Sequence, residues 1–183
     1  ELDPAALDDD ELQSVNTVYY EDPSQSIFSE NESPDVPFRY SLNPYRGCEH
    51  GCAYCYPRPS HEYLGFSAGL DFDTRILIKR RAPTLLSQRF QTKSWEPQPV
   101  ALSGNTDSYQ PVERELEITR KCLQVFLRHR NPVSIVTKGG LIQRDVDILG
   151  ALAERNLVRV SISLTTLRND VAGAMEPRAA RPD

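Results

Sequence analysis

Three cysteines lie within eight residues of one another, and their spacing is the strongest chemical signal in the chain. Cys48, Cys52 and Cys55 form a C-x3-C-x2-C pattern. Cysteine thiolates hold four-iron clusters, and three thiolates leave the fourth iron without a protein ligand. Such an open iron can bind a substrate, as a catalytic metal keeps one coordination position free. The spacing therefore predicts a [4Fe-4S] cluster with a catalytic role.

A structural zinc site is the alternative for the same loop. His50 or His61 would then complete a Cys3His set, and the chain would be a zinc-stabilised nucleic-acid-binding module without catalysis. Zinc modules usually bring paired ligands from two places, whereas the three thiols here share one short loop. The cluster is therefore favoured, with both histidines in structural roles. Cys122 falls on a predicted helix, where a free cysteine is expected to pack as a small hydrophobe.

The elements that must position this loop follow a β/α pattern. Strands expected near residues 100, 133 and 158 start 33 and 25 residues apart, which brackets the roughly 30 residues of one unit of a (β/α) barrel. Such units predict an α/β fold with a parallel sheet and a site at the carboxyl ends of its strands. Strands are expected over 39–43, 75–79, 100–103, 133–137 and 158–164, and helices over 83–91, 112–130, 144–155 and 168–175.

Charge divides the chain into two parts. Residues 1–36 contain 11 acidic residues and no Lys or Arg, which predicts an extended acidic arm, draped over the body by Tyr19, Tyr20, Ile27 and Phe28. Residues 37–183 hold all 21 basic residues and the other 15 acidic ones, so a net charge of +6 permits a nucleic-acid partner without requiring one. No apolar run approaches the roughly 18–20 residues that cross a bilayer, and the acidic N-terminus does not resemble a signal peptide. We therefore expect a cytoplasmic protein with no membrane partner.

Longer motifs extend the cysteine signal. The chain resembles the radical S-adenosylmethionine (SAM) superfamily, in the bacterial DNA repair photolyase-like branch related to spore photoproduct lyase. The resemblance spans residues 15–183 and rests on SLNPYRGCEHGCAYCY (41–56), HEYLG (61–65), GLDFDT (69–74), TDSYQPVE (106–113), VSIVTK (133–138), VSIS (160–163) and MEPR (175–178).

The resemblance implies a fold, an activity and partners. It implies a partial (β/α) barrel with about four of the usual six strands, so that 37–183 would be the N-terminal part of a barrel truncated at Asp183. In this superfamily an external donor of the flavodoxin or ferredoxin type reduces the cluster. SAM is then cleaved to a 5'-deoxyadenosyl radical, which abstracts hydrogen from the substrate. Damaged DNA is the substrate suggested by analogy.

The resemblance also assigns contacts to SAM. Tyr54 would meet the adenine, Lys138 the carboxylate, and the turn after the second barrel strand the amino group or ribose. Asp107 and Lys138 would thus supply both signs of charge for the zwitterionic end of SAM. The alternative is that Asp107 is a local helix cap and Lys138 a solvated loop lysine. The full set of expected SAM contacts is Tyr54, Gly104, Asn105, Thr106, Asp107, Lys138, Ser161 and Ser163.

Overall fold

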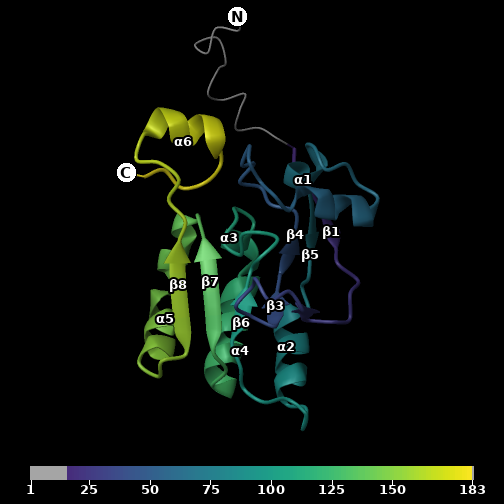
Figure 1. Ribbon diagram of the computed structural model, residues 1–183, viewed down its shortest axis with the longest axis vertical. Coiled ribbons are helices and arrows are strands. Elements are labelled where there is room, and N and C mark those ends of the chain that lie inside the picture. The colour runs from purple at the N-terminus through teal and green to yellow at the C-terminus, as the bar shows by residue number, and fades with distance from the viewer. Residues whose placement is uncertain (1–15, 183) are drawn as a thin grey trace, which may run out of the picture.

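The computed structural model describes residues 16–182, which build a five-stranded main sheet (Figure 1). The strand order is β2-β3-β6-β7-β8. The four neighbouring strands β3, β6, β7 and β8 run parallel, and β2 pairs antiparallel with β3 at one edge. The predicted α/β fold with four parallel barrel strands is confirmed. The bounds are β2 Ser29–Glu30, β3 Tyr40–Leu42, β6 Val100–Leu102, β7 Val133–Thr137 and β8 Val158–Ile162.

Helices follow the strands and bury the core. The main ones are α2 (Ala82–Phe90), α4 (Ile118–His129) and α5 (Val146–Ala153). All three residues of β6 are buried, as expected for the central strand of a parallel sheet. Helix α4 buries an apolar stripe that includes Cys122, whose side chain is fully buried among hydrophobic residues. The predicted core position of Cys122 is confirmed.

A second, three-stranded sheet lies beside the main one. It has the order β1-β5-β4, with β1 (Val18–Glu21) parallel to β5 (Arg75–Ile78) and β4 (Tyr45–Arg46) antiparallel to it. The strand expected at 75–79 is therefore present, but it lies outside the main sheet. Strands β1 and β2 both come from the predicted arm, of which residues 1–15 lie outside the described part.

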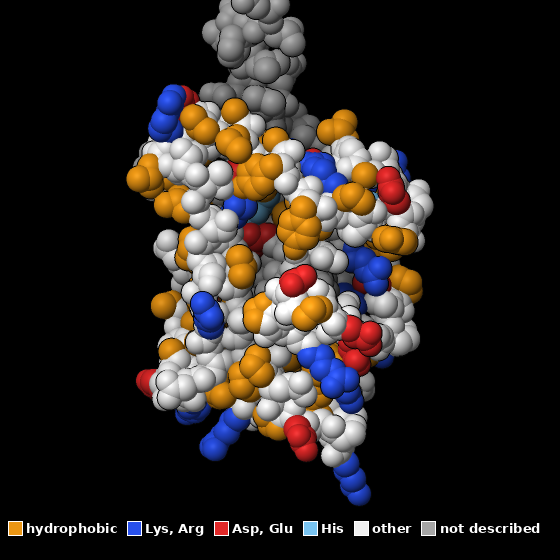
Figure 2. Space-filling view, viewed as in Figure 1, with side chains coloured by type: hydrophobic (Ala, Val, Ile, Leu, Met, Phe, Trp, Pro, Cys, Tyr) orange, Lys and Arg blue, Asp and Glu red, His pale blue; other side chains and the backbone are white. Residues whose placement is uncertain are grey.

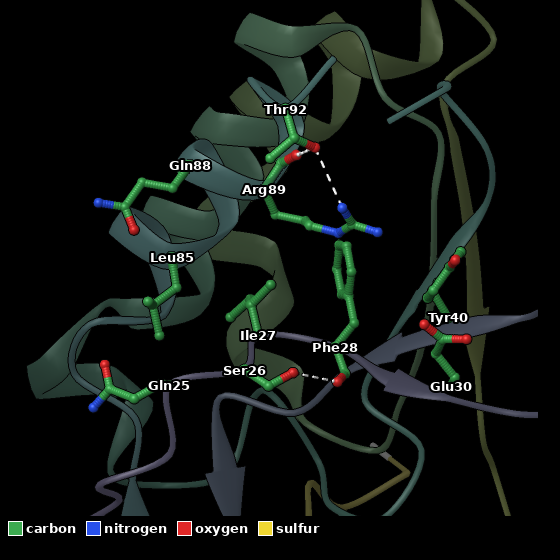
Figure 3. Close-up of a pocket in the computed structure, with 10 residues that line it drawn as sticks. All are labelled: Gln25, Ser26, Ile27, Phe28, Glu30, Tyr40, Leu85, Gln88, Arg89 and Thr92. Atoms are coloured by element: carbon green, nitrogen blue, oxygen red, sulfur yellow. Dashed lines mark hydrogen bonds between the residues drawn. The ribbon is translucent and has the colours of Figure 1, made fainter. Parts of the chain in front are cut away.

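Aromatic packing fastens the segment between β1 and β2 to the body. Ile27 is buried, and the ring of Phe28 packs against Tyr40, Phe90 and Trp95 with centroids 5.2–6.1 Å apart. A groove of about 390 Å³ separates this segment from α2 (Figure 3). None of the cysteines lines it.

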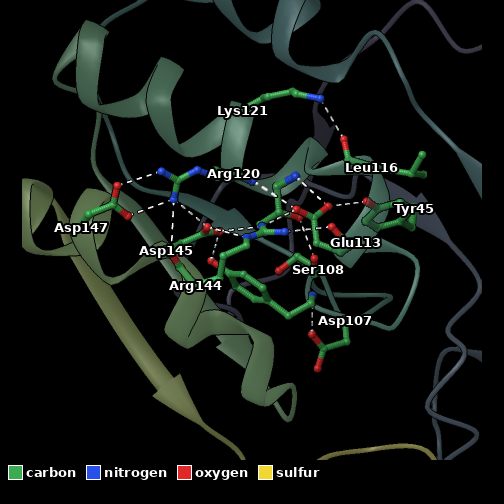
Figure 4. A network of polar contacts seen from close by, with 12 residues as sticks. Tyr45, Asp107, Ser108, Glu113, Leu116, Arg120, Lys121, Arg144, Asp145 and Asp147 are labelled. Carbon is green, nitrogen blue, oxygen red and sulfur yellow. Dashed lines mark hydrogen bonds and ion pairs between the residues drawn. The ribbon is translucent and has the colours of Figure 1, made fainter.

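The helix predicted over 112–130 is broken, so the prediction of a single helix is wrong. It divides into α3 (Glu113–Leu116) and α4, with Glu117 in the left-handed region at φ 53°. The buried Glu113 carboxylate causes the break, because it accepts the N–H groups of Thr119 (3.0 Å) and Arg120 (3.3 Å) and so caps a new helix. Figure 4 shows that the same carboxylate also binds Tyr45 and Arg144.

The remaining elements are short. They are η2 (Arg58–Leu64), α1 (Asp71–Thr74), η3 (Gly140–Asp145) and α6 (Asn169–Met175). The helix expected at 144–155 is the continuation of η3 into α5, and β8 ends two residues before the predicted boundary at 164. In the described part of the chain, no helix combines the length and apolar character needed to span a bilayer.

Candidate functional site

The cysteine loop follows β4 and turns at two glycines. Gly47 and Gly51 have φ values of 85° and 67°. A Cβ at Gly47 would lie 2.8 Å from the carbonyl oxygen of Phe72, and one at Gly51 would lie 2.6 Å from the Arg178 guanidinium. Both turns therefore favour glycine for its left-handed conformation, and Gly47 also for space, because the atom near it belongs to the backbone.

A buried amide from the loop after β6 holds the first half of the cysteine loop. The Oε1 atom of Gln110 accepts the N–H of Glu49 at 3.0 Å, and its Nε2 donates to the carbonyl of Gly47 at 3.3 Å. The Glu49 carboxylate in turn accepts the N–H of Val112 and the hydroxyl of Tyr19, both at 2.8 Å. Sequence reasoning missed the role of Gln110, although the TDSYQPVE motif that contains it was noted.

The second half of the loop rests against the segment after α6. The N–H of Ala53 donates to the carbonyl of Met175 at 2.9 Å, and the N–H of Arg178 donates to the carbonyl of His50 at 3.2 Å. The Arg178 guanidinium also donates to the carbonyl of Glu49. The MEPR motif is thus docked directly on the cysteine loop.

All the predicted site residues line one cavity of about 680 Å³. Its volume lies within the roughly 300–1,000 Å³ typical of ligand pockets. The cysteine loop forms one wall. The others are the segment 36–38, the inner faces of β6, β7 and β8, and the loops that follow these strands. Figure 1 shows these strand ends below α6, and Figure 2 shows a hollow there in the same view. The sequence-predicted lining residues are Cys48, Cys52, Tyr54, Cys55, Gly104, Asn105, Thr106, Asp107, Lys138, Ser161 and Ser163.

The three thiols of the cavity are free and largely sheltered from water. Burial raises the pKa of Cys48 well above its ordinary value, and the nearby Asp107 carboxylate adds to the rise. Burial, with Glu176 close by, raises the pKa of Cys52 to about 11, and burial also raises the pKa of Cys55. The thiols are therefore protonated at neutral pH and would release protons on binding iron.

The donor set fits a four-iron cluster by its chemistry. Three free thiols line one cavity, and each would bind its own iron. Within residues 16–182 no three or more His, Cys, Asp or Glu side chains meet in an arrangement that could hold a metal ion. A single zinc ion would need such a meeting, with ligands about 2.0–2.3 Å from one centre.

The two histidines of the zinc alternative have different positions. His61 is fully buried away from the cavity, where its Nε2 lies 2.9 Å from the carbonyl oxygen of Arg75. His50 lines the cavity with its Nδ1 atom 3.5 Å from the Asp107 carboxylate. Burial lowers the pKa of His50, against the opposing effect of Asp107. A neutral imidazole is therefore expected beside the thiols.

Asp107 is held rigidly by three donors from two segments, its own loop and the end of β7. Its carboxylate accepts the hydroxyl of Thr137 at 2.6 Å and the N–H groups of Lys138 and Tyr109 at 2.7 and 2.8 Å. The contact with Tyr109 is a local turn and not the helix cap of the alternative interpretation, because α3 begins at Glu113 with Val112 at its N-cap. The contacts with Thr137 and Lys138 have a second effect, because they connect the ends of β6 and β7 at the cavity wall.

Lys138 is not a solvated lysine, so that alternative is wrong. Its side chain is 17% exposed, and its ammonium contacts Glu176 at 2.8 Å, Ser163 at 2.8 Å and Thr165 at 3.2 Å. The ammonium also lies 5.4 Å from the centre of the Tyr54 ring. Glu176 was not among the predicted site residues, since a carboxylate in a loop motif gives no sequence signal for its partner.

Fold and site together define a class of protein: a partial (β/α) barrel with a three-cysteine loop at the carboxyl ends of its strands. Residues 42–183 match the Radical SAM superfamily, and the chain belongs to that superfamily.

Relatives by sequence come from bacteria and archaea. Uncharacterized protein Rv2578c of Mycobacterium tuberculosis is 39% identical over 149 residues, which cover 79% of this chain and 44% of the relative. Uncharacterized protein MJ0683 of Methanocaldococcus jannaschii is 24% identical over 76% of this chain and 49% of its own length. The chain thus spans less than half the length of these curated relatives.

Solved structures of spore photoproduct lyase share the fold. One, a variant with bound AdoMet and dinucleoside spore photoproduct, superposes with a TM-score of 0.61 at 15% identity, over 90% of this chain and 44% of the lyase. Another, complexed with dinucleoside spore photoproduct, gives a TM-score of 0.62 at 14% identity, over 97% of this chain and 48% of the lyase. At this identity the similarity establishes the fold alone.

Proposed function

We propose that this chain carries the cluster-binding and SAM-binding part of a radical SAM enzyme. The observation that carries the proposal is the shared cavity, where three free thiols stand opposite the charged and hydroxyl side chains of the strand ends. Cys48, Cys52 and Cys55 would hold a [4Fe-4S] cluster with one iron open to SAM. The chemistry that the cluster would supply is reductive cleavage of SAM, with an electron from a flavodoxin- or ferredoxin-type donor.

The chain's own residues would bind and orient SAM. The Lys138 ammonium, with Ser163 beside it, suits the methionyl carboxylate, because charge-assisted hydrogen bonds of this kind are strong in a sheltered pocket. Tyr54 stands near the third thiol as the adenine contact, with Ser161 and the turn 104–107 as further polar contacts. Asp107, whose oxygens already accept three hydrogen bonds, would serve chiefly to fix that turn.

Metal analysis after anaerobic purification tests the proposal. We expect about four irons and four sulfides per chain, with loss of iron on changing Cys52 to Ala. Cys122→Ala is the matched control, because it removes a buried thiol outside the cavity. One equivalent of zinc with no iron would instead support the binding-module alternative.

DNA is the substrate that we propose to test first. The structural relatives named above are complexed with dinucleoside spore photoproduct, and residues 37–183 carry a net charge of +6 that permits a polyanionic partner. Incubation of the reduced, cluster-loaded protein with SAM and ultraviolet-damaged DNA should yield 5'-deoxyadenosine in a lesion-dependent amount. Equal yields with undamaged DNA and with no DNA would count against a DNA lesion as substrate.

A further inference from the structure

The segment after α6 connects the cysteine loop to the end of β7. On one side, Met175, the last residue of α6, and Arg178 make backbone hydrogen bonds with Ala53 and His50 of the cysteine loop. On the other side, Glu176 forms an ion pair with Lys138 at 2.8 Å. One short segment therefore fixes the place of the lysine relative to the thiols.

Glu176 stands behind the cavity wall. Its side chain is 7% exposed and does not line the cavity, whereas its partners Lys138 and Tyr54 do. One carboxylate oxygen, Oε1, accepts from the Lys138 ammonium, the Thr165 hydroxyl (2.6 Å) and the Tyr54 hydroxyl. A buried carboxylate with three donors is well held, because each donor offsets part of the cost of removing its charge from water.

We propose that Glu176 is a positioning residue for SAM, which acts by holding Lys138 and Tyr54 in place for the two ends of the cosubstrate. This inference rests on the proposed function. Lys138 has three side-chain partners, and Ser163 and Thr165 alone do not fix a flexible four-carbon chain as an ionic partner does. The docked position of Glu176 on the cysteine loop sets the spacing between the thiols and the ammonium.

The first test uses the metal-free protein and needs no SAM. The labelling rate of the Lys138 amine by an acylating reagent is measured by peptide mass spectrometry in the parent, Glu176→Gln and Glu154→Gln proteins. Glu154→Gln is the matched control, because it removes the same charge from a carboxylate 78% exposed to solvent. We expect labelling of Lys138 to rise severalfold in Glu176→Gln alone, with exposed Lys93 unchanged as internal reference. An unchanged rate at Lys138 overturns the proposal.

The second test measures binding to the cluster-loaded protein. Glu176→Gln should weaken SAM affinity about tenfold, because the Lys138 ammonium loses the ionic partner that holds it toward the methionyl carboxylate. Affinity for 5'-methylthioadenosine, which lacks the methionyl carboxylate but keeps the adenine, should fall less, because only the Tyr54 contact is weakened. Glu176→Asp should restore part of the SAM affinity. Iron content should equal that of the parent. Unchanged or tighter SAM binding overturns the inference, whereas a parent protein that assembles no cluster overturns the proposed function and leaves the labelling result to decide the role of Glu176.

Discussion

At the scale of single residues, the cavity wall contains side chains of two kinds. Some, such as Asp107, accept three hydrogen bonds from the protein itself, two of them from backbone N–H groups. Others, such as Lys138, are held by side chains alone, and a ligand could replace the hydroxyl partners Ser163 and Thr165 while the ion pair with Glu176 stays. Replacing the first kind should cost stability, and replacing the second kind should cost ligand affinity.

Lys138→Ala directly tests whether replacing a side chain of the second kind lowers ligand affinity. We expect SAM affinity to fall by about tenfold to a hundredfold, because a hydrogen bond between charged groups contributes about 1.5–3 kcal/mol. Iron content should stay at the level of the parent, since the lysine is not a cluster ligand. Equilibrium dialysis with labelled SAM gives the affinity, and Lys93→Ala supplies a control for an exposed lysine. SAM binding that is insensitive to Lys138→Ala would refute the assigned contact.

At the scale of elements, sequence patterns predicted the parallel strands and their helices but not the contacts that connect these elements. Strands β6, β7 and β8 were predictable because each is a short run rich in apolar residues at a regular interval. The pairing of β5 with β1 was not predictable, since it joins segments more than 50 residues apart and β1 is too short and exposed for a clear pattern. The residues that line the cavity were predictable because the resemblance assigns roles to their positions. Glu176 and Gln110 also lie in motifs, but they act through partners that are distant in the sequence.

The break between α3 and α4 was not predictable either, because Glu113 also acts through partners that are distant in the sequence. It leads to a prediction about stability. Glu113 is fully buried and accepts from Tyr45, Thr119, Arg120 and Arg144. Glu113→Gln should lower the free energy of unfolding by about 1.5–3 kcal/mol, because a charged acceptor is lost from a buried network. Urea denaturation measures the change. Glu115→Gln, on the exposed face of α3, should change stability by less than about 0.5 kcal/mol; equal effects of the two variants would contradict the capping role.

Asp22 contacts charged residues of the three-stranded sheet β1-β5-β4, and these contacts make the stability of the fold depend on pH. Asp22, directly after β1, is buried, which by itself raises the pKa of its carboxyl. Hydrogen bonds from Ser24 and the charges of Arg46 and Lys79 outweigh that effect and lower the pKa below its usual value. A depressed carboxyl pKa stabilises the fold above the pKa of the unfolded chain, about 3.9, and this stabilisation is lost as pH falls through the folded-state pKa.

Asp22→Asn tests this dependence. The variant should be less stable than the parent by a constant amount between about pH 5 and 8, and the difference should shrink below about pH 4 as the parent carboxyl takes up a proton. Thermal unfolding across this pH range measures it, with the exposed Asp35→Asn as control. A difference that persists unchanged at the lowest pH would show that packing, and not charge, explains the effect.

At the scale of the whole molecule, the main helices lie away from the residues that line the cavity. Helix α4 contributes no residue to the cavity, whereas the cavity edge carries one exposed arginine, Arg159 on β8. If nucleic acid approaches the cavity, it meets the Arg159 side chain and not the basic residues of α4. The net charge of +6 on residues 37–183 therefore matters through its distribution as much as through its size.

This distribution predicts how DNA binding depends on salt. The logarithm of the association constant should fall linearly with the logarithm of salt concentration, because each phosphate contact releases condensed counterions. Arg159→Gln should reduce the magnitude of that slope by about one, and Arg128→Gln on the exposed face of α4 should leave it unchanged. Fluorescence anisotropy with a labelled duplex at several salt concentrations measures the slopes. Equal slopes for the parent and Arg159→Gln would place the phosphate backbone away from the cavity edge, and affinity independent of salt would remove the electrostatic case for a nucleic-acid substrate altogether.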